Sequence, residues 1–206
     1  MDLPPADHGI VLYWLPLGAG GDRCVQTSGR TYERVAARRD RRPPARLYHA
    51  ACELRVDGRR FTLEMAPAWS GPPGDHGVVA TGPVGLRWLG RSRWFRYEVR
   101  CWPEGTIPDL VEAVGGPTHV PTTPQRTTRA LALVPAFPTA IWGRDELRTG
   151  DMWNSNSLIA WVLAASGHAL TALRPPTGGR APGWDAGLTV AARTATGTTP
   201  ATDTRS

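Results

Sequence analysis

The dipeptide Asp57-Gly58 divides residues 47–67 into two β-like runs, and no other feature restricts the fold as strongly. An Asp-Gly pair between alternating apolar runs is the strongest short signal for a β-hairpin with a two-residue turn. The pairs predicted across this turn are Val56–Arg59, Leu54–Phe61, Cys52–Leu63 and Ala50–Met65. Their apolar members share one face, which we expect to be a core face of a sheet.

The opposite face of this hairpin carries polar side chains. With Ala51 opposite Glu64, Glu64 becomes the diagonal neighbour of His49, within reach of a side-chain contact. A His beside a carboxylate can act as a general base, because the carboxylate orients the ring and stabilises the imidazolium. The same pattern also fits a surface His with an acidic neighbour.

A second informative stretch is Asn154-Ser155-Asn156-Ser157, which directly precedes an apolar run. From Leu158 onward the apolar residues recur at spacings of three and four, and Gly167 supplies a stop. These features predict a buried helix over 154–166. Asn and Ser favour helix starts because they accept the unpaired N–H groups of the first turn, so Asn154 is expected to be the cap.

The remaining pattern places strands before helices. β-like runs at 10–17, 78–89 and 93–102 precede helical segments at 108–116 and 123–135, the latter with Thr123 as cap and Pro124 at the first helical position. This order predicts an α+β fold in which an antiparallel sheet has a helix packed against it. We expect residues 1–188 to form a single domain and residues 189–206, poor in apolar side chains, to form a disordered tail.

Basic charge is concentrated in one segment. All 24 basic residues are arginine, and seven of them lie within residues 30–46, interrupted only by Glu33 and Asp40. Such a segment is either a solvated loop or a surface that meets nucleic acid or an acidic partner.

Several classes of protein and site are not expected. No apolar run reaches about 18 residues, so no membrane span is predicted. Three cysteines without a C-x-x-C spacing and five scattered histidines predict neither a disulfide framework nor a metal site, and no cofactor motif is present. The first residues lack the pattern of a signal peptide, so a reducing cytoplasm is the expected location.

The run YHAACELRVDGRRFTLE early in the chain, followed by NSNSLIAWVL at the start of a late helix, resembles the circularly permuted papain-like proteins. This group includes the lecithin:retinol acyltransferase-like, NlpC-like and PPPDE peptidase-like branches. In the permuted members a His on an early hairpin strand faces a nucleophilic Cys at the start of a later helix, often within Asn-Cys-Asn-[Ser/Thr]. Here His49 matches the histidine and Ser155 takes the place of the cysteine.

The resemblance implies a hydrolase or acyltransferase that acts on an amide or ester of a peptide or acyl-type small substrate. Ser155 would be the nucleophile, His49 its base and Glu64 or Glu53 the third member, with Asn154 or Asn156 as an oxyanion donor. A hydroxyl is a poorer nucleophile than a thiol at neutral pH, so the sequence does not decide whether the protein is an active enzyme. Two alternatives are a catalytically inactive papain-like binding protein and a basic interaction protein that uses residues 30–46.

Overall fold

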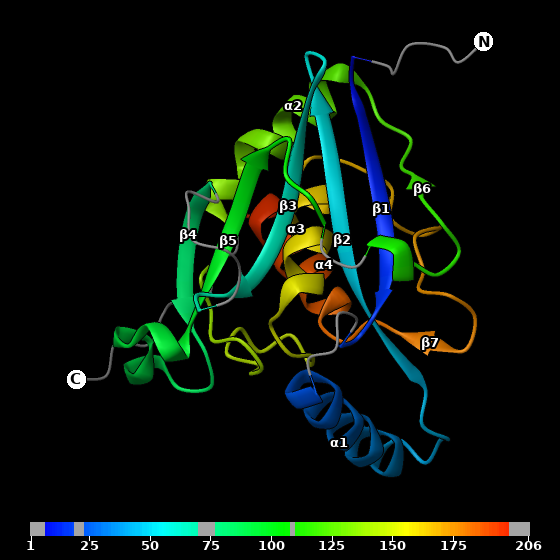
Figure 1. Ribbon diagram of the computed structural model, residues 1–206, viewed down its shortest axis with the longest axis vertical. Coiled ribbons are helices and arrows are strands. Elements are labelled where there is room, and N and C mark those ends of the chain that lie inside the picture. Colours follow the sequence, from blue (N-terminus) through cyan, green and yellow to red (C-terminus); the bar gives the residue numbers. More distant parts are fainter. Residues whose placement is uncertain (1–6, 19–22, 70–76, 108–109, 198–206) are drawn as a thin grey trace.

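An antiparallel sheet is the central feature of the fold, as the sequence predicts (Figure 1). The computed structural model describes residues 7–18, 23–69, 77–107 and 110–197. In this part of the chain the sheet has seven strands, in the order β4-β5-β3-β2-β1-β6, and β7 pairs in parallel with one end of β2. The strands are β1 (Gly9–Pro16), β2 (Arg46–Val56), β3 (Arg59–Pro67), β4 (Val78–Pro83), β5 (Arg96–Pro103), β6 (Thr118–His119) and β7 (Gly179–Arg180).

Helices cover one face of this sheet, and α1 lies apart beyond the lower end of β2 in Figure 1. The helices are α1 (Arg23–Arg39), α2 (Pro124–Leu133), α3 (Ser155–Ala165) and α4 (Trp184–Ala195). α2 begins with the predicted cap Thr123, whose side chain accepts the backbone N–H of Arg126. α3 is buried along most of its length because it lies between the sheet and α4. No helix in the described ranges is long and apolar enough to cross a membrane.

The strands alternate between a core face and an opposite face. Apolar residues of the core face pack with the helices; they include Leu12, Trp14, Ala50, Cys52, Leu54, Leu63, Met65, Tyr97 and Val99. A smaller apolar cluster on the other face contains Leu15, Ala51 and Ile107. The period of two in β2 therefore separates the even-numbered residues, which face α3, from the odd-numbered ones, which include His49.

The Asp57-Gly58 hairpin forms in the predicted register, but only over part of its length. Pairing between β2 and β3 runs from Val56–Arg59 to Cys52–Leu63. The next predicted pair, Ala50–Met65, lies beyond this ladder, whereas on its other side β3 stays paired with β5 as far as Pro67–Tyr97. The two strands therefore separate at residues 48–51, next to the start of α3.

The expectation of a loop over residues 30–46 was wrong for most of the segment, because α1 extends to Arg39. Arginine and alanine are strong helix formers, and the first proline after this run is Pro43. Glu33 and Ala37 are four residues apart, so they share a face of α1, and both are buried.

The expected boundary at residue 188 falls inside α4. Val190 and Ala191 are buried against the core, so residues 189–195 are part of the packed helix. Residues 198–206 of the expected tail lie outside the described residues. The strand expected over 78–89 ends at Pro83, and the chain continues in a 3₁₀ helix, η2 (Arg87–Arg91).

Glu33 attaches α1 to the rest of the molecule. Its carboxylate accepts hydrogen bonds from Arg42 and from the backbone N–H of Ala45 (2.8 Å), and it forms an ion pair with Arg180 at 3.2 Å. Burial alone would raise the pKa of Glu33, but the bonds from Arg42 and Ala45 and the charges of Arg42 and Arg180 lower it overall.

We predict that Glu33→Gln lowers the free energy of unfolding at pH 7 by about 1–3 kcal/mol, because the partly buried Arg42 loses the negative charge of its buried partner. The lowered pKa in the folded state means that this contribution is present above the usual carboxyl pKa of 4.5 and is lost as pH falls through the folded-state value. Urea unfolding at pH 7 and at acidic pH measures both effects. Asp40→Asn, which removes a more exposed partner of Arg42, is the control and should change stability less. Equal stability of Glu33→Gln and wild type at pH 7 would contradict the assignment.

Candidate functional site

The start of α3 is closed by a reciprocal cap. The Asn154 side-chain oxygen accepts the backbone N–H groups of Asn156 (2.9 Å) and Ser157 (3.4 Å). In return, the Ser157 hydroxyl accepts the backbone N–H of Asn154 at 3.0 Å. This is a capping box with Asn154 as the cap, as the sequence predicts.

Asn156 joins the start of α3 to the point where β2 leaves β3. Its side-chain oxygen accepts the N–H of Ala50 at 2.6 Å, and its Nδ2 donates to the carbonyl of Tyr48 at 3.1 Å. The amide therefore hydrogen-bonds the Tyr48 carbonyl and the Ala50 N–H, the backbone groups on either side of His49. In a continuous hairpin, backbone groups of β3 would form these bonds. Nδ2 also donates to the carbonyl of Pro182 at 2.8 Å. Asn156 is 2% exposed, so each of these bonds is shielded from water.

The turn before α4 is attached to the same helix start. Asn154 Nδ2 donates to the carbonyl of Pro182 (2.9 Å), and the Ser157 hydroxyl donates to that of Gly183 (2.8 Å). Gly183 has a φ of 87°, and a Cβ there would lie 2.2 Å from the Asn154 side-chain oxygen. Glycine is therefore required at this position.

Asp151 completes this connection, and the sequence analysis did not identify it. Its carboxylate accepts the N–H of Gly183 at 2.6 Å and that of Met152 at 2.8 Å. Burial raises the pKa of Asp151, and the two backbone bonds oppose this shift. An acidic residue just before a helix is a weak signal in a sequence, because its partner Gly183 lies 32 residues away.

Ser155 differs from the other three residues of the run 154–157, whose side chains all take part in these hydrogen bonds. It is partly buried, and its hydroxyl forms no hydrogen bond within the described part of the chain. The cap engages the N–H groups of Asn156 and Ser157, and that of Leu158 bonds to the carbonyl of Asn154. The backbone N–H of Ser155 is thus the first-turn donor left for a ligand, beside the Ser155 hydroxyl and at the positive end of the helix.

The two asparagines differ in what they can offer as oxyanion donors. Both N–H bonds of the Asn156 amide point to carbonyls, those of Tyr48 and Pro182, so this side chain has no donor to spare. Asn154 uses one of its two for Pro182. The Ser155 N–H is therefore better placed than the Asn156 amide to stabilise an oxyanion.

His49 lies between the two residues of β2 that Asn156 binds. It is opposite Leu15 in the ladder with β1, and its side chain belongs to the face of the sheet turned away from the core. The ring is largely buried, and this burial lowers the pKa of His49 to about 4. No hydrogen bond links His49 to Ser155 or to Glu64 in the described residues.

The two candidate carboxylates have arginine neighbours. Glu64 is opposite Arg100 in the ladder with β5, and their charged groups lie 3.9 Å apart. Glu53 binds Arg60 at 2.9 Å and accepts the hydroxyl of Tyr13 at 3.3 Å. The predicted diagonal contact of Glu64 with His49 assumed that β2 and β3 stay paired beyond Cys52, whereas they separate there.

Two hollows lie near the lower end of β2 and the turn before α4, and neither is lined by Ser155 or His49. The larger one, of about 500 Å³, is lined by Tyr48, Leu47 and residues of α1, with arginines at 30, 34 and 46. The smaller one, of about 310 Å³, lies between Asp151 and the segment 174–185. No group of three or more His, Cys, Asp or Glu residues suited to a metal ion occurs in the described ranges.

Comparison with known proteins does not identify a relative of this chain. Searches against protein-family models, curated proteins and solved structures found no match to this chain. The function is therefore inferred from the residues and geometry of the chain itself.

We predict that Asn156→Ala lowers the free energy of unfolding by about 2–4 kcal/mol, because three buried backbone groups lose a partner. Chemical denaturation followed by circular dichroism measures the change. Ser155→Ala is the matched control: the adjacent residue has no hydrogen bond to lose, so its effect should stay within about 0.5 kcal/mol. A similar small effect for both variants would show that the Asn156 amide does not hold β2 to α3.

A second prediction concerns the titration of His49. Its ring should titrate near pH 4 rather than 6.5 in an NMR pH series, with assignment by the His49→Gln variant. Between these pH values the unfolded chain binds more protons than the folded chain at this residue, so acidification should destabilise the wild type. His49→Gln should lose less stability over the same range. A His49 resonance that titrates near 6.5 would contradict the burial of the ring.

Proposed function

We propose that this protein is a papain-like hydrolase or acyltransferase in which Ser155 attacks an amide or ester carbonyl and His49 is the base. The observation that carries the proposal is the Asn156 amide, which binds the backbone on both sides of His49. Ser155 immediately precedes Asn156, and consecutive Cα atoms are about 3.8 Å apart. The start of α3 therefore lies against the segment of β2 that carries His49.

The separation of β2 from β3 supports access between these two residues. The core face of β2 is turned toward α3, whereas His49 belongs to the other face. Where a sheet is continuously paired, side chains on its two faces are separated by the backbone layer. At residues 48–50 the β3 side of β2 is occupied by the Asn156 amide in place of a strand, so we infer that Ser155, the residue before it, reaches the edge of this layer beside His49.

The proposed reaction transfers a proton at each of its two stages. His49 accepts the Ser155 proton as Oγ bonds to the carbonyl carbon, and the oxyanion that forms lies beside the Ser155 N–H. When the C–N or C–O bond breaks, the imidazolium returns the proton to the leaving amine or alcohol. Water or another alcohol or amine then attacks the acyl-serine, with His49 again taking and returning the proton.

Two features of the site limit the rate. A serine hydroxyl needs its proton removed during attack, unlike a thiolate. Burial lowers the pKa of His49, which keeps the ring neutral and ready to accept a proton but makes the imidazolium costly. We therefore expect slow turnover, with activated esters as the best substrates. Glu64 remains the proposed third member, with Arg100 as its described partner.

The 500 Å³ hollow beside Tyr48 is the proposed place for the substrate. It is next to the β2 segment that Asn156 binds, and Leu47 and Val114 contribute apolar surface to it. Its volume lies within the range of about 300–1,000 Å³ usual for small-molecule sites. Its lining also includes three arginines and the acidic Glu33 and Glu112, and a peptide or an acyl-type small molecule fits this mixture of apolar and charged groups.

A catalytically inactive binding protein is the second candidate. It is favoured by the surroundings of His49: burial lowers the pKa of the ring, and no carboxylate in the described part of the chain forms an ion pair or hydrogen bond with it. Without a carboxylate the imidazolium gains little stabilisation. In that case the hollow and the start of α3 bind a peptide or acyl group without turnover.

Ser155→Cys separates these possibilities from a simple helix cap. In a Cys24→Ser background, the new thiol should react with a chloroacetamide probe at least about tenfold faster with His49 present than in Ser155→Cys/His49→Gln. Burial raises the pKa of Cys52, and that of Cys101 to about 11, so these thiols should label slowly. Intact-mass spectrometry over time gives the rates.

Equal labelling rates with and without His49 would contradict the proposed pairing. If the pairing is present, hydrolysis of an activated ester by the wild-type chain, lost in Ser155→Ala and in His49→Gln, supports the enzyme. Labelling that depends on His49 without any ester hydrolysis by the wild type indicates the binding protein instead.

A further inference from the structure

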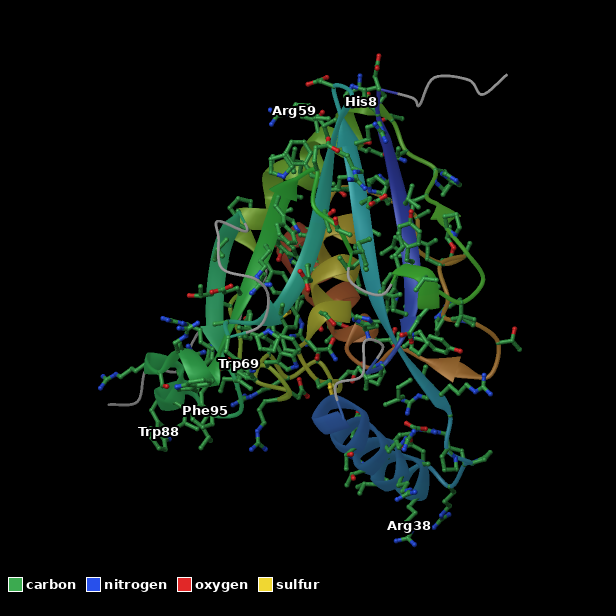
Figure 2. All side chains as sticks on the ribbon, viewed as in Figure 1. His8, Arg38, Arg59, Trp69, Trp88 and Phe95 are labelled. Atoms are coloured by element: carbon green, nitrogen blue, oxygen red, sulfur yellow. The ribbon has the colours of Figure 1, made fainter. Side chains whose placement is uncertain are left out.

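One corner of the molecule exposes a cluster of large apolar side chains, here called the aromatic corner. It consists of Trp69, Leu86, Trp88, Trp94 and Phe95. Figure 2 labels Trp69, Trp88 and Phe95, which lie beside the lower ends of β4 and β5. Trp88 is 69% exposed and Trp94 63%, while the other three are 43–44% exposed. Tryptophan is usually well buried in folded proteins, so several exposed aromatic rings at one corner point to a binding surface.

The corner is built on an ordered framework. Its residues come mainly from η2 and a second 3₁₀ helix, η3 (Arg93–Phe95), with Ser92 capping the second. The backbone N–H of Val84 donates to the carbonyl of Phe95 (2.8 Å), and Arg87 forms an ion pair with Glu146. The rings of Trp69 and Trp94 lie 6.3 Å apart. The side chains are therefore presented outward by a fixed backbone.

Positive charge surrounds these rings. The segment 86–96 contains four arginines and no acidic residue. Arg87 is balanced by Glu146, but Arg91 and Arg93 are exposed and form no ion pair in the described part of the chain. A partner for this surface must therefore accept apolar groups and also carry negative charge.

We propose that the aromatic corner docks onto an anionic lipid surface. Tryptophan prefers the interface of a bilayer, where its ring contacts acyl chains and its N–H stays among polar groups. Arginine at the same level pairs with lipid phosphates, and each basic residue near an anionic surface adds to binding. Arg91 and Arg93 lie in the sequence between Trp88 and the pair Trp94-Phe95, so both kinds of contact are present on one corner.

The shape of the corner favours a lipid surface over single-stranded nucleic acid. Nucleic-acid strands bind along a charged groove with aromatic rings as stacking platforms. Neither of the two hollows described above is lined by residues of the corner. The exposed rings protrude instead, and the aliphatic Leu86 offers no stacking face, which suits insertion among acyl chains.

Co-sedimentation with vesicles tests the proposal. The full chain should bind vesicles of phosphatidylcholine with phosphatidylglycerol and bind phosphatidylcholine alone more weakly, with a blue shift of tryptophan fluorescence on binding. Trp88→Ser/Trp94→Ser and Arg91→Gln/Arg93→Gln should each weaken binding to the mixed vesicles about tenfold or more. Circular dichroism and thermal unfolding establish that the variants are folded.

Matched controls remove the same chemistry from another part of the molecule. Arg38→Gln/Arg39→Gln lowers the net charge equally on α1, and Val111→Ser removes an exposed apolar side chain distant in sequence. Both should bind vesicles as the wild type does, and so should Ser155→Ala, which makes this test independent of the proposed enzyme. Failure of the wild type to bind mixed vesicles, equal loss in the α1 variant, or tighter binding to a single-stranded oligonucleotide than to the vesicles would overturn the proposal.

Discussion

The side-chain amide of Asn156 is the contact on which the other features of the site depend. It replaces one peptide group of β3, so β2 can leave the hairpin without unpaired backbone groups at Tyr48 and Ala50. Buried N–H and C=O groups without partners destabilise a fold, and a strand cannot separate from its neighbour in the interior unless something takes over its hydrogen bonds. The end of the β2–β3 pairing next to His49 therefore requires an amide at this position of α3.

The same amide connects the sheet to the turn before α4 through the carbonyl of Pro182. Asn154, Ser157 and Asp151 all bind this turn as well. Three segments far apart in the sequence thus meet at one helix start. The local polar network fixes the position of α3 along the sheet, whereas apolar packing alone would leave it free to slide by small amounts.

The sequence was most informative where structure depends on neighbouring residues. Asp57-Gly58 sets the hairpin register near the turn, and Asn154 and Thr123 cap their helices as predicted. The separation of β2 from β3 was not predictable, because it depends on Asn156, more than 100 residues away. α1 was missed because its arginines suggested a solvated loop, although the buried Glu33 gives it an inner face.

The division of labour within Asn154-Ser155-Asn156-Ser157 supports a functional role for Ser155. The first, third and fourth residues each form buried hydrogen bonds that the fold requires, and their residue types follow from those bonds. The hydroxyl of Ser155 forms none in the described part of the chain, so stability does not require a serine there. This residue starts α3, its N–H has no acceptor among the described residues, and it precedes the amide that binds the backbone on both sides of His49; these features support the proposed nucleophile.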